Sequence, residues 1–171
     1  DFALVRGLHS AIIDEADSVL VDEAVTPLIL SATRSSRGLR EAVEVVSHIA
    51  SNLKPQIDYY ALQHTQSIEL LSGAIETLEY AAATLPSVWR PAPRREQLLR
   101  HALHARHFFH SGHHYVVDNE KIVLIDEFTG RMTPGRTLTS GLHQAIEAKE
   151  GVAITDPTDS ITQMSFQAFF R

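Results

Sequence analysis

The sequence predicts an α+β fold in which helices predominate. Three stretches repeat apolar residues at helical spacing, over residues 39–53, 68–82 and 94–109. The apolar runs elsewhere are short, β-branched or leucine-rich, and bounded by turn residues, as strands are. The chain has 171 residues, 44% of them hydrophobic, which is enough for one core or for one modest core with an appendage.

Composition excludes several classes of function. The formal net charge of −6 disfavours a nucleic-acid-binding protein, because binding a phosphate backbone requires a basic face. The chain has no cysteine, which excludes disulfides and thiol chemistry. No apolar run approaches the length of a membrane span, and no signal peptide is visible. Because the first residue is Asp1 and not Met, we expect an excised piece of a longer protein.

The first thirty-eight residues read as strand, turn and strand. An apolar run over 8–13 is expected to be a strand that presents Asp14, and 18–24 is expected to be a short helix or turn. Pro27 prevents helix continuation, 28–30 is an exit strand, and 31–38 is a polar linker. The apolar residues of the short helix are expected to be buried: Val19, Leu20 and Val21.

The middle of the chain is predicted to alternate helices with short connections. The helix at 39–53 ends at Pro55, and residues 57–62 are a short strand. The helix at 68–82 is followed by the proline-rich connection 85–93. The helix at 94–109 buries a face made of Leu98, Ala102, Ala105 and Phe109.

The last third is predicted to hold a hairpin and two helices. Strands at 113–117 and 121–125 flank Asp118-Asn119-Glu120, and Asn tolerates the left-handed conformation of tight turns. Thr139 or Ser140 caps a helix that stops at Gly151. Asp159 or Ser160 begins a final helix that carries Met164, Ala168 and three phenylalanines.

Two adjacent carboxylates after the first apolar run indicate phosphate-transfer chemistry. A strand that ends in Asp14-Glu15 can hold Mg²⁺ through the first carboxylate, usually by way of water. The second carboxylate can orient or deprotonate an attacking water. The alternative is that Asp14 caps the next helix and Glu15 is solvated.

Three blocks of the sequence resemble SecA, the bacterial preprotein translocase motor. They are IIDEADSVLVDEAVTPLILSA, IVLIDEFTGRMTPGRTLTSGLHQAIEAKEGV and ITQMSFQAFFR, and they occur in the family's order at about its separations. The first looks like the family's second ATPase (DEAD-type) motif. Residues 33–114 match the family only loosely.

The resemblance implies a mostly helical bulb inserted, through a two-stranded antiparallel stem, into a fragment of a P-loop ATPase (α/β) lobe. Residues 1–25 would belong to the nucleotide-binding domain, 26–127 to the preprotein cross-linking domain, and 128–171 to the return into the nucleotide-binding domain. The stem would pair 26–31 with 122–127, and the bulb would be 32–119. An inserted domain needs its entry and exit close together, and strand pairing supplies that.

The resemblance also implies a function: the preprotein clamp of an ATP-driven translocation motor. In the intact motor Asp14 would bind Mg²⁺, Glu15 would be the base, and ATP would be the cofactor. The partners would be an unfolded preprotein, the membrane channel and the other motor domains, with the protein peripheral at the cytoplasmic side of the bacterial inner membrane. The chain contains no GxxxxGK[ST] loop, so we expect it neither to bind nor to hydrolyse ATP alone.

The candidate contacts for an unfolded peptide lie on the stem and on nearby aromatics. Strand addition to an exposed edge, with pockets for side chains, is a common way to hold an extended chain. The candidates are Leu28, Leu30, Tyr59, Tyr60 and Val123, with Trp89, Phe108 and Phe109 as further aromatics. The alternative is core packing, which is the expected role of Phe109 because it lies on the helix stripe.

Six histidines gather in and after the third helix: His101, His104, His107, His110, His113 and His114. Histidine is a common metal ligand, but a spacing of three residues spirals around a helix. A solvated helix face is the alternative. Arg131 and Arg136, in a glycine-rich loop, have either phosphate or neighbouring carboxylates as their expected partners.

The sequence departs from the family at three places, which suggests a divergent SecA-like paralogue. Val25 stands where the family has Arg, Thr137-Leu138 stand where it has Arg-Trp, and ITDPTDS replaces an Asn-rich stretch. Two other functions compete with the clamp: a DExD-type nucleic-acid remodeller, and a non-enzymatic histidine-rich interaction or metal-binding module.

Overall fold

The structure is a computed structural model that describes residues 10, 12–22, 28–33, 36–127, 129–139, 141–165 and 168. It divides into two compact units. Unit 1 comprises residues 1–32 and 159–171, and unit 2 comprises residues 33–158. Helices and small sheets both contribute, so the predicted α+β class is confirmed.

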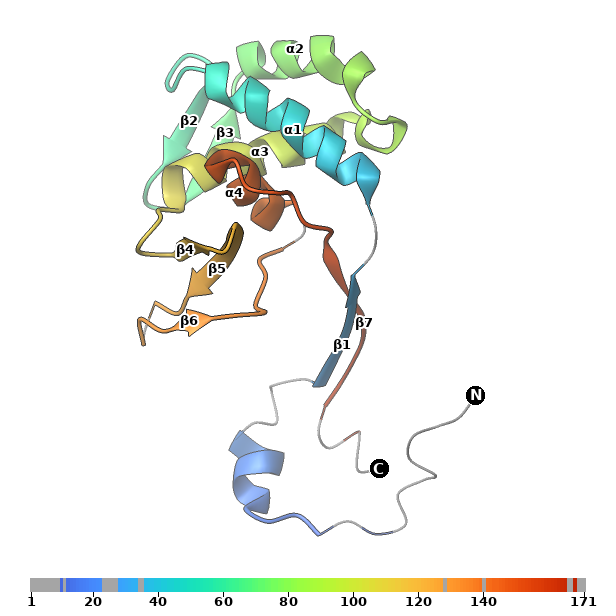
Figure 1. Cartoon of the computed structure of the whole chain (residues 1–171). Coiled ribbons are helices and arrows are strands. Elements are labelled where there is room, and N and C mark those ends of the chain that lie inside the picture. Colours follow the sequence, from blue (N-terminus) through green and yellow to red (C-terminus); the bar gives the residue numbers. More distant parts are fainter. Residues whose placement is uncertain are drawn as a thin grey trace. The chain divides into compact units, whose positions relative to one another are not determined.

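Four helices build unit 2: α1 (Arg37–Asn52), α2 (Ser72–Tyr80), α3 (Ala92–Phe108) and α4 (Leu142–Glu150). Helix α3 lies at the centre, with α1 and α4 both packed against it (Figure 1). Short 3₁₀ turns at Ala81–Thr84 and Ser87–Trp89 carry the chain from α2 to α3. The predicted helices at 39–53 and 94–109 are therefore confirmed, with shifts of one or two residues at their ends.

Helix α1 forms because its apolar residues recur at helical spacing and its other face is polar. Leu39, Val43 and Val46 are buried, while Arg37 and Glu41 are exposed and lie 3.7 Å apart one turn along the helix. The helix ends at Asn52, before Pro55. Its buried face packs on α3, as the sequence pattern requires.

A hairpin stands where the sequence pattern predicted the start of the second helix. Strand β2 (Tyr59–Leu62) pairs antiparallel with β3 (Ser67–Leu70), and α2 begins only at Ser72. The strand predicted at 57–62 is confirmed. The helix predicted at 68–82 is wrong in its first turn, because Ile68 is buried from a strand; a short apolar run does not distinguish the two structures.

A second sheet has the order β4-β5-β6, with β4 at Tyr115–Asp118, β5 at Lys121–Ile125 and β6 at Met132–Thr133. The predicted hairpin is confirmed: Asp118 pairs with Lys121 across a two-residue turn. Both turn residues have positive φ, 48° at Asn119 and 59° at Glu120, as a type I′ turn requires.

Helix α3 is shared by two apolar clusters. One lies toward α1, α2 and β3 and includes Leu39, Leu78 and Leu99. The other, toward α4 and β5, consists of Ala105, Tyr115, Ile122, Leu124, Ala145 and Ile146. Residues of β5 and α4 therefore belong to the core of unit 2, outside the predicted bulb range of 32–119.

Helix α4 has well-defined ends. The Gly141 N–H donates to Gln144 Oε1 at 2.8 Å, and Gly151 ends the helix with φ 71°. The predicted helix and its stop at Gly151 are confirmed. Glu147, which is 1% exposed, accepts hydrogen bonds from the backbone N–H and hydroxyl of Thr155, and so fastens the following segment to the helix.

Unit 1 contains a short π-helix at Ser18–Asp22 and a two-stranded sheet. The sheet pairs β1 (Leu28–Thr33) with β7 (Thr158–Met164) (Figure 1). The predicted exit strand is confirmed. The final helix, predicted to begin at Asp159 or Ser160, is wrong: residues 158–164 are a strand, because pairing with β1 overrides a weak helical pattern.

The predicted stem is also wrong. Of the predicted stem, the described residues 28–31 do not pair with 122–127, because β5 pairs with β4 and β6 instead, and residues 26 and 27 lie outside the described residues. The physical reason is local: a two-residue turn closes β4 onto β5, whereas pairing with residues a hundred positions earlier closes a long loop. The strand β7, which follows unit 2, lies beside β1 in the place predicted for residues 122–127.

The described helices are too short or too polar to span a membrane.

Candidate functional site

Asp14 and Glu15 lie in a turn just before the π-helix, and both are exposed. The Glu15 N–H donates to Asp14 Oδ1 at 3.0 Å, and Glu15 has φ 50°. Residues 10, 12 and 13 are not in a strand, and the rest of the run at 8–13 lies outside the described residues. Val21 is 68% exposed, so its predicted burial is wrong. The side chain of Val19 is outside the described set.

The candidate peptide contacts are not gathered at one place. The backbones of Leu28 and Leu30 lie in β1, and their side chains are outside the described set. Tyr59 is buried and its hydroxyl lies 2.7 Å from His107 Nε2, so that side chain belongs to the core. Tyr60 is 43% exposed, on the opposite face of β2, whereas Val123 is half-buried in a different sheet.

Several of the clustered histidines make hydrogen bonds within the protein. His104 Nε2 lies 2.8 Å from the carbonyl oxygen of Gln66, which joins α3 to the β2–β3 hairpin. The His110 N–H donates to His114 Nδ1 at 3.0 Å. Burial lowers the pKa of His101, His107, His114 and His143. In the part of the chain that the structure describes, no three His, Cys, Asp or Glu side chains are placed to hold a metal.

The further aromatic residues mostly pack in the interior. Phe108 is 7% exposed, in the cluster shared with α1, and Phe109 is partly buried against both clusters. Trp89 ends a 3₁₀ turn and packs on the same cluster as Phe108. The expected core role of Phe109 is therefore confirmed in part, since its side chain also lines the cleft described next.

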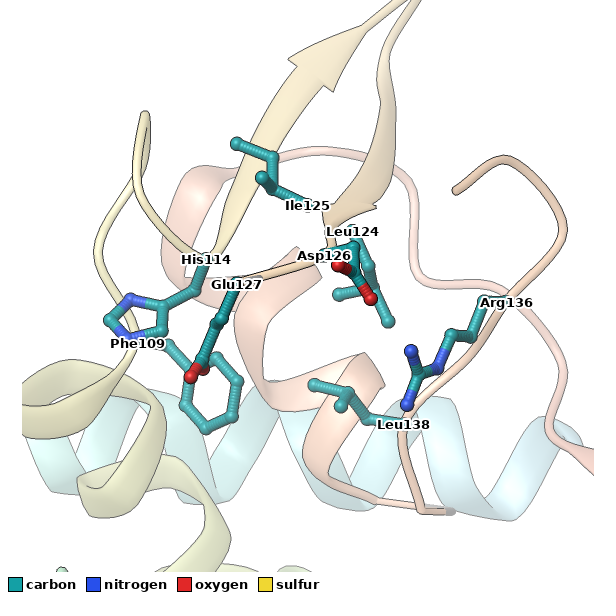
Figure 2. Close-up of a pocket in the computed structure, with 8 residues that line it drawn as sticks. All are labelled: Phe109, His114, Leu124, Ile125, Asp126, Glu127, Arg136 and Leu138. Carbon is teal, nitrogen blue, oxygen red and sulfur yellow. The ribbon is translucent and has the colours of Figure 1, made fainter. Parts of the chain in front are cut away.

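A cleft of about 310 Å³ opens where β5 ends (Figure 2). Phe109, Leu124 and Leu138 supply apolar walls, while Asp126 and Arg136 bring charges of both signs. The cleft is also lined by His114, Ile125 and Glu127. Of the residues predicted to contact a peptide, only Phe109 lines this cleft, and its predicted role is core packing. The available signal was that an Asp-Glu pair follows an apolar run here, as it does at Asp14-Glu15.

The hydrogen bonds of Asp126 fix the loop beside the cleft. Asp126 Oδ1 accepts from both the N–H and the hydroxyl of Thr129, each at 2.8 Å, and the Asp126 N–H donates to the Arg131 carbonyl at 2.9 Å. The ring of His114 lies 5.5 Å from that of Phe109, centroid to centroid. Burial and the neighbouring His113 lower the pKa of His114, while the carboxylate of Glu127 opposes that shift.

A buried polar group supports the cleft from the side of α4. Lys149 Nζ donates to the Phe109 carbonyl at 2.6 Å and to the Ala105 carbonyl at 3.3 Å, so a cation caps the C-terminus of α3. Tyr115 is fully buried and donates its hydroxyl hydrogen to Glu150. Burial and this carboxylate raise the pKa of the Tyr115 hydroxyl. These bonds hold the end of α3 rigidly beside β4.

The cleft has the chemistry of a binding surface. Its apolar walls suit an aliphatic or aromatic side chain, and its rim offers carboxylates and a guanidinium to a polar backbone or side chain. The Asp126 carboxylate already accepts a hydrogen bond from Thr129, whereas the Arg136 side chain is exposed. An extended polypeptide would meet both requirements.

Comparison with known proteins identifies a domain. The model of a family described as the SecA preprotein cross-linking domain matches residues 40–147. That range falls within unit 2, at residues 33–158.

Curated relatives match nearly the whole chain. A protein translocase subunit SecA 2 of Magnetococcus marinus is 55% identical over 98% of this chain and 26% of the relative. A subunit SecA 2 of Chlorobium chlorochromatii is 45% identical over 98% of this chain and 25% of its own length. A subunit SecA of Cupriavidus taiwanensis is 36% identical over 97% of this chain and 20% of its own. The chain thus spans a quarter or less of the length of the latter two and 26% of the first.

Proposed function

Since this chain belongs to the SecA preprotein cross-linking domain family, we propose that it is the preprotein-binding segment of an ATP-driven protein translocation motor. The observation that carries the proposal is the coincidence of the family match, residues 40–147, with one compact unit, residues 33–158. The chain would hold an unfolded preprotein while ATP turnover elsewhere in the motor drives its movement.

The two-stranded stem of the inserted unit would be the β1–β7 pair, which is called the neck below. The chain enters unit 2 after β1 and leaves it before β7, and these two strands are neighbours in one sheet. Paired entry and exit strands are what an inserted domain needs. The proposal therefore keeps the mostly helical bulb and its neck but assigns β7 as the second strand.

The preprotein would add to an edge of this neck. A two-stranded sheet leaves one unpaired edge on each strand, and such edges bind extended chains through backbone hydrogen bonds. Leu28 and Leu30 remain candidate contacts on β1. Among the aromatic candidates, Tyr60 is the exposed one, whereas Val123 lies in β5, the central strand of the other sheet, and is half-buried.

Nucleotide chemistry would belong to the intact motor. There Asp14 would hold Mg²⁺ and Glu15 would act on the attacking water of ATP hydrolysis. Both side chains are exposed, which fits a site completed by other protein surface. We expect no saturable binding of a fluorescent ATP analogue by this chain alone; binding that Asp14→Asn abolishes would contradict that.

The partners and location follow from the family. They would be an unfolded preprotein, the membrane channel and the remaining motor domains, at the cytoplasmic face of the inner membrane. The departures at Val25 and Thr137-Leu138, with relatives that carry the name SecA 2, favour a specialised paralogue. Neither the nucleic-acid remodeller nor the metal-binding module gains support from a net charge of −6 or from the hydrogen-bonded histidines.

Binding of an unfolded, signal-bearing peptide tests the proposal. We would titrate a fluorescent peptide with the chain and with full-length motor, in parallel with single-stranded RNA and with zinc. Proline is then placed in turn at Leu28, Ile29 and Leu30, because proline removes one backbone donor at a time and successive donors face opposite edges. We expect peptide binding alone, lost at the position that faces the free edge.

Two results would contradict the proposal. One is RNA or zinc binding that is tighter than peptide binding. The other is peptide affinity that no proline substitution in β1 lowers, while circular dichroism shows that each variant is folded. A proline variant that unfolds is replaced by the equivalent substitution in β7, at Ile161 or Thr162.

A further inference from the structure

A second cleft, of about 440 Å³, lies between α1, α3 and the segment that follows α4. Ser47, His48 and Ser51 line it from α1, and Arg106 lines it from α3. The side of α4 contributes aliphatic surface from Ala148, Val152 and Ile154. All of these residues belong to unit 2, and none is part of the neck or of the cleft in Figure 2.

Arg106 has far fewer partners than a guanidinium needs. Its one hydrogen bond in the described structure is from Nη2 to the Ser47 carbonyl, at 3.3 Å. Its Nε is shielded from solvent and has no hydrogen-bond partner among the described residues. A guanidinium has five N–H donors, and a shielded donor without an acceptor costs free energy.

No carboxylate of the described residues neutralises this cation. None of the ion pairs found there includes Arg106, whereas Arg40, Arg95 and Arg100 each have a carboxylate partner. Glu44 lines the same cleft but is exposed and makes no ion pair with Arg106. Glu147 is committed to Thr155. Burial is the main cause that lowers the pKa of Lys149, a second cation, and the nearby charge of Arg106 adds to that shift.

The surroundings favour a carboxylate over a phosphate. A carboxylate accepts two parallel N–H bonds from a guanidinium, and the aliphatic wall suits the methylenes that carry it. Phosphate has no methylenes to cover the aliphatic wall, so it should bind less well.

We propose that this cleft is a carboxylate-binding site in which Arg106 receives an acidic side chain from a polypeptide that docks on α1, α3 and α4. The docking group is a glutamate or aspartate of another protein segment, with its methylenes against Ile154 and its oxygens on the guanidinium. The site lies outside the proposed preprotein edge, so the two proposals stand or fall separately.

Nuclear magnetic resonance of the arginine side chain provides the test. The Nε–H resonance of Arg106 in the ¹⁵N-labelled chain, identified by its loss in Arg106→Lys, is followed during titration with glutarate. Sodium chloride at matched ionic strength and inorganic phosphate are titrated in parallel. We expect a saturable shift with glutarate, no saturation with chloride, and weaker binding of phosphate.

Matched variants make the result specific. Arg106→Gln should weaken glutarate binding by about tenfold or more, as loss of a charge-assisted bidentate pair does. Arg100→Gln, on the same helix but paired with Glu96 at 3.0 Å, should leave it unchanged. A shift that does not saturate, or one that survives in Arg106→Gln, overturns the proposal. Tighter binding of phosphate than of glutarate overturns the assignment of a carboxylate.

Discussion

Two Asp-Glu pairs follow apolar runs in this chain, and the structure treats them differently. Asp14 and Glu15 are exposed, and the Asp14 carboxylate accepts a hydrogen bond from the N–H of Glu15, the next residue. Asp126 follows β5, whose Leu124 is 5% exposed, and its carboxylate fixes the Thr129 turn. The first pair therefore lies in an exposed turn of unit 1, whereas Asp126 of the second pair stabilises a turn in unit 2. The two differ because only the second pair directly follows a strand that is packed in an apolar core.

The largest expected difference lies two residues before each pair. Leu124→Ala should destabilise the chain by about 2–5 kcal/mol, since it leaves a cavity in the cluster between α4 and β5. The matched change Ile12→Ala should alter stability by less than about 0.5 kcal/mol, because Ile12 is fully exposed. Urea unfolding followed by circular dichroism measures both; equal effects would remove the distinction between the two pairs.

The acidic residues themselves should differ by less. Asp126→Ala removes the acceptor of two hydrogen bonds from Thr129 and should cost about 1–2 kcal/mol. Asp14→Ala should be neutral within about 0.5 kcal/mol. The same urea titration applies, with Thr129→Val as a check that the loss at Asp126 belongs to this turn. A costly Asp14→Ala would mean that the first turn is also part of a folded core.

Acid should act on unit 2 through its buried histidines. Burial, with the charge of His104 second, lowers the pKa of His101 in the fold, so the unfolded chain binds more protons below about pH 6.5. Stability is therefore greatest above the unfolded pKa and falls as the pH drops toward the folded one. His101→Gln should flatten the dependence of unfolding free energy on pH between 7.5 and 5. An unchanged slope would show that His101 is not buried neutral.

The smallest effect concerns residues with positive φ. Glu120, at φ 59° in the β4–β5 turn, should gain about 0.5–1 kcal/mol from Glu120→Gly, because glycine adopts this conformation without steric cost. Glu15, at φ 50° in the first pair, should gain little from Glu15→Gly, since its turn opens without unfolding unit 2. Thermal unfolding of the two variants tests this contrast, and a larger gain at Glu15 would reverse it.

Local sequence patterns predicted local structure well. The apolar stripe of α1 and the Asn119 turn depend on residues a few positions apart, and both are confirmed. The partner of β1 was mispredicted because the stem implied by the resemblance used residues 122–127, which the predicted hairpin at 113–125 also used, and the local hairpin is the pairing that forms. Residues 158–164 were mispredicted as a helix because their strand structure depends on pairing with β1, which lies more than a hundred residues earlier in the sequence.

The candidate sites show the same contrast between features set by nearby residues and features set by distant ones. The resemblance identified the domain family, which the family match at residues 40–147 supports, whereas Tyr59 was proposed as a peptide contact and proved to be buried against His107. Burial of an aromatic in a four-residue strand depends on the helix across from it. The clefts at Asp126 and at Arg106 each join at least two elements distant in the sequence, so a local pattern such as the second Asp-Glu pair marks one wall at most.

Site-specific photo-crosslinking tests the central claim most directly. A photoreactive phenylalanine analogue replaces Leu30 in β1, Ile161 in β7, or Tyr80 at the end of α2, which is 92% exposed, in the full-length motor engaged with an unfolded preprotein. We expect preprotein adducts from β1 or β7 and none from position 80. Adducts that form equally at position 80, or no adduct from either strand, would contradict the assignment of this chain as the preprotein-binding segment.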